Sequence, residues 1–274
     1  MTRGRVLDRT TAELGAHARL LLLGESYPAR DGFLQRVDPT LKLVGVTAVV
    51  VTAVATHNLL TLLALLVAAF GLARLSSIPL RVLVARVWLP PVLAFVVVAP
   101  RLVLTPGAPV LSLGPLSPTE AGVAYVVTFV ARVAACVALL SLVLLTTRFA
   151  DVLAALRRLR VPTLLVGIVA VTYRYLLVFF AELQRLVVAR RARTVRNRSI
   201  SFRESWRASG TLLGTFFVRT LERSERVQMA AAARGGGRRA IDVGGTHRVA
   251  SHRRSNVAFA TLALLAIVGM VVVA

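Results

Sequence analysis

The residues best suited to chemistry are arginines that follow regularly spaced alanines, in a pattern that occurs twice. Residues 185–194 read Arg-Leu-Val-Val-Ala-Arg-Arg-Ala-Arg-Thr, and residues 226–235 read Arg-Val-Gln-Met-Ala-Ala-Ala-Ala-Arg-Gly. In each copy an Ala is followed three and four positions later by Ala-Arg, and on a helix these positions share one face. Alanines allow another protein to approach closely, and arginine donates directed hydrogen bonds to carboxylates or carbonyl oxygens. The repeat therefore predicts two helix ends that dock into two partner sites.

Other reactive groups are few and scattered. The only lysine, Lys42, follows Pro-Thr-Leu and not a glycine-rich loop, so the chain is not itself a P-loop ATPase. The histidines have no partners at zinc-ligand spacing, although His247 and His252 share a short basic linker. The single cysteine, Cys136, excludes an intrachain disulfide and lies in an apolar run, which favours a packed hydrophobe over a reactive thiol. We expect a non-catalytic chain without a cofactor, which alone neither hydrolyses ATP nor binds a metal tightly.

Composition places the chain among membrane proteins. Apolar residues make up 57% of its 274 residues, and its mean hydropathy is +0.74. Its net charge of +22 could indicate nucleic acid or anionic lipid as a partner. The long apolar runs are nearly free of charge, however, and the arginines lie between them. This distribution favours a membrane protein.

The apolar runs predict an all-α polytopic protein with about five transmembrane helices. They cover 41–75 (two short spans broken at 56–58), 78–104, 121–147 and 256–274. Pro90-Pro91 predicts a kink in the third span, which either is a structural bend or shapes a contact surface for a neighbouring subunit. Arg132 lies well inside the fourth span, where it needs a carbonyl, an acidic partner or a subunit interface.

Basic residues set the expected orientation. Arg74, Arg81 and Arg86 flank the second turn, and four arginines follow the fourth span between 148 and 160, whereas the first and third turns lack Lys and Arg. By the positive-inside rule the amino terminus is cytoplasmic. Arg101, near the outer end of the third span, is a mild exception.

Residues 161–180 are apolar enough for a further crossing, but the charges that follow argue against one. Between Leu183 and Arg239 there are fourteen Arg and three Glu, too basic a segment to translocate readily. We therefore interpret 162–194 as one long helix in or obliquely under the membrane, apolar first and basic last. Residues 206–234 repeat this design, and Gly235-Gly236-Gly237 ends the second helix.

The repeat and its surroundings resemble the T components of energy-coupling factor (ECF) transporters. The sequence Ser224-Glu225-Arg226-Val227 leading to Ala233-Arg234-Gly235 is similar to their second Ala-Arg-Gly signature. Glu182 followed by Ala192-Arg193-Thr194 resembles the first signature, with threonine where glycine is usual. Similar segments occur at Arg174-Tyr175, 147–153, 159–162 and 38–43, so the resemblance extends over about 31–274. Within the family the sequence is most similar to the cobalt/nickel-type, CbiQ-like subgroup.

The resemblance implies a scaffold and coupling subunit of an ECF-type ABC importer in the plasma membrane of a prokaryote. It would join two cytoplasmic ABC ATPases to a separate substrate-binding membrane subunit, for cobalt or nickel or a vitamin. Residues implied to dock the ATPases are Ala192, Arg193, Thr194, Ala233, Arg234 and Gly235. Residues implied to support them on the coupling helices are Glu182, Arg185, Ala189, Glu225, Arg226 and Ala230.

Two other function classes remain. One is a basic membrane protein that binds nucleic acid or anionic lipid through 181–239, but phosphate binding needs no ordered alanines. The other is a membrane-embedded enzyme, which would need polar groups at one membrane depth, and Arg132 and Arg174 have no acidic neighbours in the sequence. We expect lipid and protein partners, and no nucleic acid.

The expected organisation has five parts: a cytoplasmic amino-terminal segment (1–40), a four-span region (41–147), a coupling-helix region (148–240), a basic linker (241–255) and a carboxyl-terminal transmembrane helix (256–274). Within the first part, residues 16–23 could form a short amphipathic piece on the membrane surface.

The topology leads to a first prediction. Single cysteines at Ser199 and at Ser209, in a Cys136→Ala background, should resist an impermeant thiol reagent added to intact cells, because the basic segment stays inside. Permeabilised cells provide the positive control. Labelling of both positions from outside would show that 161–180 crosses the membrane.

Overall fold

The computed structural model describes residues 32–106, 119–193, 202–235 and 253–273. The expected surface segment 16–23, most of the loop 105–119, Thr194 and most of the linker 241–255 lie outside these residues. The chain divides into two compact units. Among the described residues, one unit holds 32–158 and 253–273, and the other holds 159–193 and 202–235.

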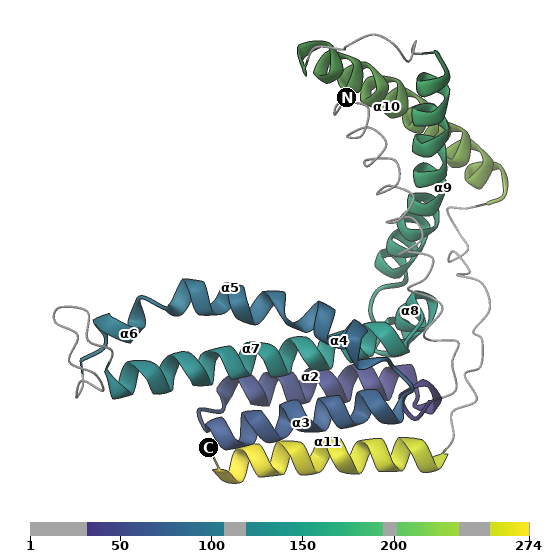
Figure 1. Ribbon diagram of the computed structural model, residues 1–274. Helices are drawn as coiled ribbons and strands as arrows, with labels where there is room; N and C mark the ends of the chain where they lie inside the picture. Colours follow the sequence, from purple (N-terminus) through teal and green to yellow (C-terminus); the bar gives the residue numbers. More distant parts are fainter. Residues whose placement is uncertain (1–31, 107–118, 194–201, 236–252, 274) are drawn as a thin grey trace. The chain divides into compact units, whose positions relative to one another are not determined.

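The regular elements of the described residues are helices, so the all-α prediction is confirmed (Figure 1). The first unit contains η1 (Leu34–Arg36), α2 (Pro39–Ala55), α3 (Leu59–Leu75), α4 (Leu80–Val87), α5 (Leu89–Val98), α6 (Arg101–Leu104), α7 (Glu120–Thr146), α8 (Phe149–Arg158) and α11 (Arg253–Val273). The second contains α9 (Thr163–Arg193) and α10 (Phe202–Ala233).

Helix lengths agree with a multi-pass membrane protein. Four segments are long and apolar enough to cross a membrane, namely 80–98, 120–146, 163–190 and 253–272. Helices α2 and α3 are apolar but have only 17 residues each, as the break predicted at 56–58 requires. Length and composition alone would let 163–190 cross, so the expectation that it does not cross stays a prediction.

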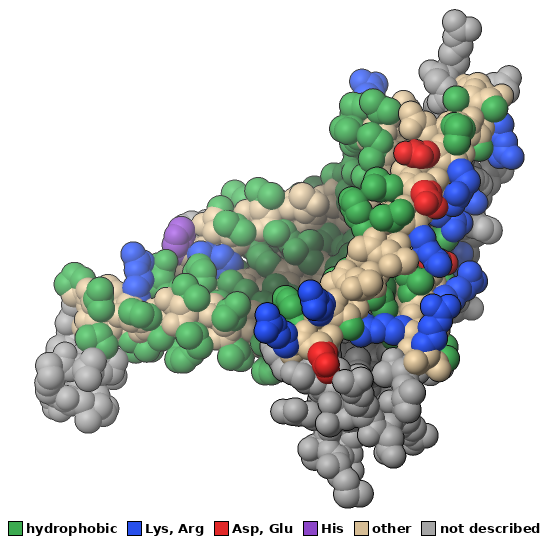
Figure 2. Space-filling model, turned by 90° about the horizontal axis from the view of Figure 1, so that it is seen from above, with side chains coloured by type: hydrophobic (Ala, Val, Ile, Leu, Met, Phe, Trp, Pro, Cys, Tyr) green, Lys and Arg blue, Asp and Glu red, His purple; other side chains and the backbone are tan. Residues whose placement is uncertain are grey.

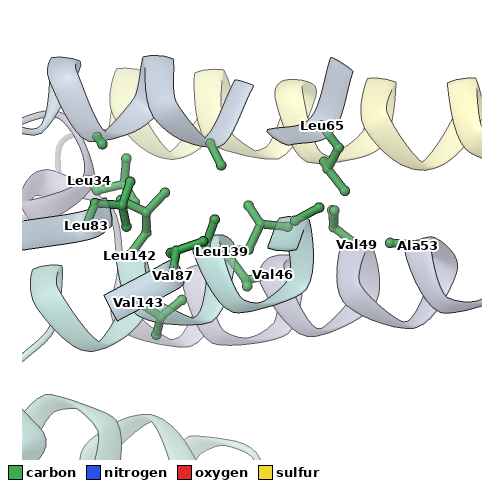
Figure 3. Packing of buried hydrophobic residues seen from close by; sticks show 14 of the residues in the cluster. Leu34, Val46, Val49, Ala53, Leu65, Leu83, Val87, Leu139, Leu142 and Val143 are labelled. Atoms are coloured by element: carbon green, nitrogen blue, oxygen red, sulfur yellow. The ribbon is translucent and has the colours of Figure 1, made fainter. Parts of the chain in front are cut away.

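Helix α7 is the central element of the first unit. It packs against α2, α3, α4 and α5, while α11 packs against α2 and α3 (Figure 1). Buried positions recur every three or four residues on α3 and α7 and include many alanines, which allow close backbone approach. They include Leu62, Leu65, Ala69 and Ala73 on α3 and Ala135, Ala138, Leu139 and Leu142 on α7. Figure 3 shows several of these side chains meeting in one core. Cys136 packs at the edge of this core, as expected for a small hydrophobe.

The third predicted span is more broken than expected. Pro90 and Pro91 start α5 after a break at Trp88, and a second break, at Ala99-Pro100, separates α5 from α6. Each proline removes a backbone N–H and so leaves a carbonyl one turn earlier without its helical donor. Only the first break was predicted. Helix α5 contains no buried residue, so its apolar side chains are available to lipid or to another membrane protein.

Two cations, the buried Lys42 and the partly buried Arg132, hold α2 and α7 in antiparallel register. The Lys42 ammonium donates to the Thr146 carbonyl (3.3 Å), the Thr146 hydroxyl (3.3 Å) and the Thr147 hydroxyl (3.1 Å). At the other end, Arg132 Nη2 donates to the Thr56 carbonyl at 2.7 Å. Of the partners left open for Arg132, the structure therefore shows a backbone carbonyl.

Each of these cations satisfies the carboxyl-terminal end of the opposite helix. Thr56 is the C-cap of α2, and Thr146 and Thr147 end α7. The last carbonyls of a helix have no partner within it, and cations are favoured near this end of the helix dipole. Lys42 and Thr56 are fourteen residues apart, as are Arg132 and Thr146, which corresponds to about 21 Å along each helix. The two contacts therefore fix one register over most of α2.

The lysine contact yields a second prediction. Lys42→Met keeps a long apolar chain but removes three hydrogen bonds to buried acceptors, so it should destabilise the protein by about 1–3 kcal/mol. Lys42→Arg should not restore stability, because a planar guanidinium does not match three acceptors around a compact ammonium. The measurement is the apparent melting temperature in detergent, with the exposed Arg36→Ala as control. A Lys42→Met protein as stable as the wild type would contradict the interpretation.

Candidate functional site

The repeat residues lie on the two longest described helices. Helices α9 and α10 have 31 and 32 residues, which corresponds to about 46–48 Å each. The prediction of one continuous helix over 162–194 is confirmed for its described residues, through Arg193. The second helix begins at Phe202, four residues before the predicted start. The second copy of the repeat therefore ends at the carboxyl terminus of α10, and the first copy lies in the last described turns of α9.

The two helices run antiparallel where they touch. The Arg223 guanidinium lies 5.9 Å from the centroid of the Tyr175 ring, and the Phe179 and Phe216 rings meet edge-on with centroids 6.1 Å apart. Further along, Arg190 Nη1 donates to the Ala208 carbonyl at 2.8 Å. Residue numbers rise on α9 as they fall on α10, so the pair is an antiparallel crossing.

Glu182 lies in the middle of this crossing. Its carboxylate accepts from Arg219 Nη1 at 2.9 Å, and Arg185 lies 3.8 Å away one turn further along α9. About half of the Arg219 side chain is exposed, and such exposed pairs contribute only about 0.2–1 kcal/mol. Glu182, expected to support the coupling helices, therefore belongs to the α9–α10 contact, whereas Arg185 is exposed and pairs with Glu182 within α9. The aromatic pair of this contact provides the apolar packing.

The carboxyl-terminal end of α10 is a compact turn that leaves Arg234 exposed. The Arg234 amide is shared between the carbonyls of Ala230 and Ala231, and the Gly235 amide donates to Ala232. Gly235 has φ +76°, the left-handed conformation that commonly ends a helix and that favours glycine. Arg234 is thus presented directly before the glycine that ends the helix.

The described docking residues are exposed, as a contact surface for another protein requires. This holds for Ala192 and Arg193 on α9 and for Ala233, Arg234 and Gly235 on α10. Ala189, Glu225, Arg226 and Ala230 are exposed as well, and Arg226 lies 3.9 Å from Glu222 one turn away. Figure 2, a space-filling view, shows basic side chains with a few acidic ones over α9 and α10. The first unit (32–158 and 253–273), called the membrane unit below, is mainly hydrophobic on the face shown.

The structure does not bring the two repeat ends together. Because the helices are antiparallel, Arg193 and Arg234 lie at opposite ends of the pair. Ala208, which contacts Arg190, is 26 residues from Arg234 on the same helix, so about 39 Å separates them. The site therefore consists of two separate tips held by one crossing.

Several residues of the crossing were not singled out from the sequence as site residues: Tyr175, Phe179, Phe216, Arg219 and Arg223. Their spacing of three and four residues on each helix marks a helix–helix stripe and could have identified them. Among the described residues, no three His, Cys, Asp or Glu side chains come together in a group that could hold a metal ion.

The chain is similar to one protein family and to the three proteins described here. A family model described as CbiQ, cobalt transport protein, matches residues 31–241. An uncharacterized protein of Methanocaldococcus jannaschii is 29% identical over 237 residues, which is 84% of this chain and 80% of that protein. A putative ABC transporter ATP-binding protein of Bifidobacterium longum is 31% identical over 215 residues, 73% of this chain and 27% of that protein. The cobalt transport protein CbiQ of Rhodobacter capsulatus is 33% identical over 146 residues, covering 52% and 58% of the two chains.

The antiparallel crossing yields a third prediction. Cysteines at positions 179 and 216, in a Cys136→Ala background, should cross-link with a short bifunctional thiol reagent. The matched control pairs 179 with 229, thirteen residues and about 20 Å further along α10, and should not cross-link. Gel mobility after cleavage at a protease site engineered between the helices provides the measurement. Equal cross-linking of both pairs would contradict the observed register.

Proposed function

The chain belongs to the CbiQ family of cobalt transport proteins, and we propose that it is the transmembrane coupling subunit of an ECF-type ABC importer. It is a multi-pass membrane protein and a transporter component. The finer assignment is that it links two cytoplasmic ATPases to a separate membrane subunit that binds the substrate. The observation that carries the proposal is the pair of exposed Ala-Arg tips at opposite ends of two crossed helices.

The chemistry of the tips suits protein partners. At the α10 tip the arginine is combined with exposed alanines and a glycine turn, so the helix end can enter a groove and donate hydrogen bonds to carboxylates or carbonyls. The resemblance of part of a putative ABC transporter ATP-binding protein to this chain supports ATPases as these partners. Movement of the ATPases would then displace the two helices and reorient the substrate subunit.

The proposed substrate is cobalt, or nickel by similarity of chemistry, and it would be bound by the companion membrane subunit. Cobalt is the substrate named in the family description and in the Rhodobacter protein's name. None of the three relatives described above is named for a vitamin, so the vitamin alternative receives no support from them. The plasma membrane location and the cytoplasmic amino terminus belong to the same proposal.

The alternative of nucleic acid or anionic lipid binding along 181–239 is less well supported. Arg190, Arg219 and Arg223 are engaged in contacts between α9 and α10, which leaves them less available to phosphates. A phosphate-binding surface also gains nothing from alanines placed beside each terminal arginine.

A fourth prediction tests the coupling role. Arg234→Ala should lower transport more than Arg193→Ala, because Gly235 lets α10 end tightly behind its arginine, whereas threonine follows Arg193. Loss of a charged hydrogen-bonding group costs about 1.5–3 kcal/mol, which corresponds to a roughly 10- to 100-fold weaker contact with the ATPase. Transport in cells and copurification of the ATPases provide the measurements.

The matched control is Arg36→Ala, an exposed arginine before α2, which should leave both measurements unchanged. Wild-type transport by both tip variants would contradict the coupling role. Salt-sensitive retention of nucleic acid by the purified protein, without any ATPase, would favour the alternative.

A further inference from the structure

Asp38 forms hydrogen bonds with Arg158, where the chain leaves the membrane unit, and with Asn256, just after the chain has returned to it. Arg158 is the last residue of α8, after which the chain leaves the membrane unit, and Asn256 lies in the first turn of α11, after the chain has returned. Asp38 immediately precedes α2. The contacts join residues 120 and 218 positions apart in the sequence.

Each polar group of Asp38 has its own partner. Carboxylate Oδ2 accepts from Arg158 Nη1 at 2.9 Å, and Oδ1 accepts from the Thr40 amide at 2.8 Å, which caps α2. The Asp38 amide donates to Asn256 Oδ1 at 2.9 Å. One residue therefore joins the amino-terminal ends of α2 and α11 to the carboxyl-terminal end of α8.

The charge of Asp38 is stabilised where it lies. Burial raises the pKa of its carboxyl, but the hydrogen bonds from the Thr40 amide and the Arg158 guanidinium together hold this pKa below its usual value of 3.8. The carboxylate is therefore ionised at neutral pH. Because the folded-state pKa is lowered, its stabilising contribution is present above pH 3.8 and is lost as the pH falls through the lowered pKa.

Helix α8 is held at its other end as well. Lys42, one turn into α2, donates to the Thr147 hydroxyl directly before α8 begins. Leu153 and Ala155 of α8 are buried, and the helix packs along α2. Both ends and one face of α8 are thus fastened to the membrane unit.

A short connecting segment with one unusual backbone conformation follows Arg158. Only residues 159–162 separate α8 from α9. Arg160 has φ +62°, a left-handed conformation that is unfavourable for residues with a Cβ. The Pro162 carbonyl then accepts from Leu165 and Val166 at the start of α9. A four-residue connection with one left-handed residue therefore directly follows the residue that Asp38 contacts.

We propose that Asp38 is a positioning residue for coupling: it ties the exit at Arg158 and the re-entry at Asn256 to α2, so that displacement of α9 and α10 reaches the membrane helices. This inference rests on the coupling function proposed above. Without the tie, docking on the ATPases and ATP hydrolysis would continue, but less of the motion would be transmitted. The expected defect is therefore a loss of transport per ATP hydrolysed.

The test uses the assembled transporter with four single substitutions and one double substitution. Asp38→Asn keeps the backbone amide and an oxygen that can cap α2 but removes the charge that pairs with Arg158, and Arg158→Ala removes the other partner. Each should lower transport per ATP at least threefold, and Asp38→Asn combined with Arg158→Ala should be no worse than either alone. Asn256→Ala should cause a similar loss, whereas Asn256→Asp, which keeps an acceptor oxygen, should cause less.

Arg36→Ala serves as the matched control, because Arg36 is an exposed arginine two residues before Asp38. Transport, ATP turnover, ATPase copurification and the apparent melting temperature are measured for each variant. Unchanged transport per ATP in Asp38→Asn and Arg158→Ala would overturn the inference. So would loss of folded protein in parallel with transport at an unchanged ratio, since that indicates stability alone. Failure of the wild-type chain to assemble with ATPases would instead contradict the proposed function.

Discussion

The end of a helix in an apolar environment leaves carbonyl groups that require a donor, and the membrane unit depends on how this requirement is met. Water is scarce in a bilayer, so the donors must come from the protein. Helix α2 spans only about 25 Å, less than the roughly 30 Å of a hydrocarbon core, so at least one of its ends lies close to lipid. Arg132 of α7 satisfies the end of α2, and Lys42 of α2 satisfies the end of α7. A cation shielded from water is costly, but at each place it is tolerated because it satisfies a carbonyl that would otherwise be unpaired.

This reciprocal arrangement explains why the single lysine lies where it does. A compact ammonium has three donors on a flexible stem and finds three acceptors at the end of α7. The more exposed basic positions carry arginine, whose planar fork suits carboxylates and exposed carbonyls. Once α2 and α7 are fixed in register, α3, α4 and α5 pack against α7, and α11 packs against α2 and α3. The second unit is held together by different interactions. Helices α9 and α10 meet at one crossing, through aromatic rings and partly exposed charged pairs.

Local patterns predicted much of this fold, because apolar runs, prolines, glycines and caps act over a few residues. The break at 56–58 and the continuous helix α9 were predicted in this way. The partners of Lys42 and Arg132 were not, since they lie 104 and 76 residues away, and many carbonyls could have satisfied either cation. The second break of the third span was also missed, although Pro100 is a local signal. For the candidate site, the repeat identified both exposed tips but not the crossing that holds them. The role of Thr194 stays a prediction.

The separation of the tips bears on the class of partner. The tips are about 39 Å apart, more than the roughly 30 Å diameter of a small domain, so docking at both arginine ends would involve two separate surfaces. A phosphate-binding protein would gain most from arginines gathered along one continuous face, whereas here some arginines hold the crossing together and others lie at the far ends. Exposed ion pairs alone are too weak to keep the two tips at a fixed spacing. The spacing is instead maintained by the length of each continuous helix and by the edge-on packing of Phe179 against Phe216. A rigid pair of this kind can transmit a displacement from one docked partner to the other, and this property favours a coupling subunit over a charged binding surface.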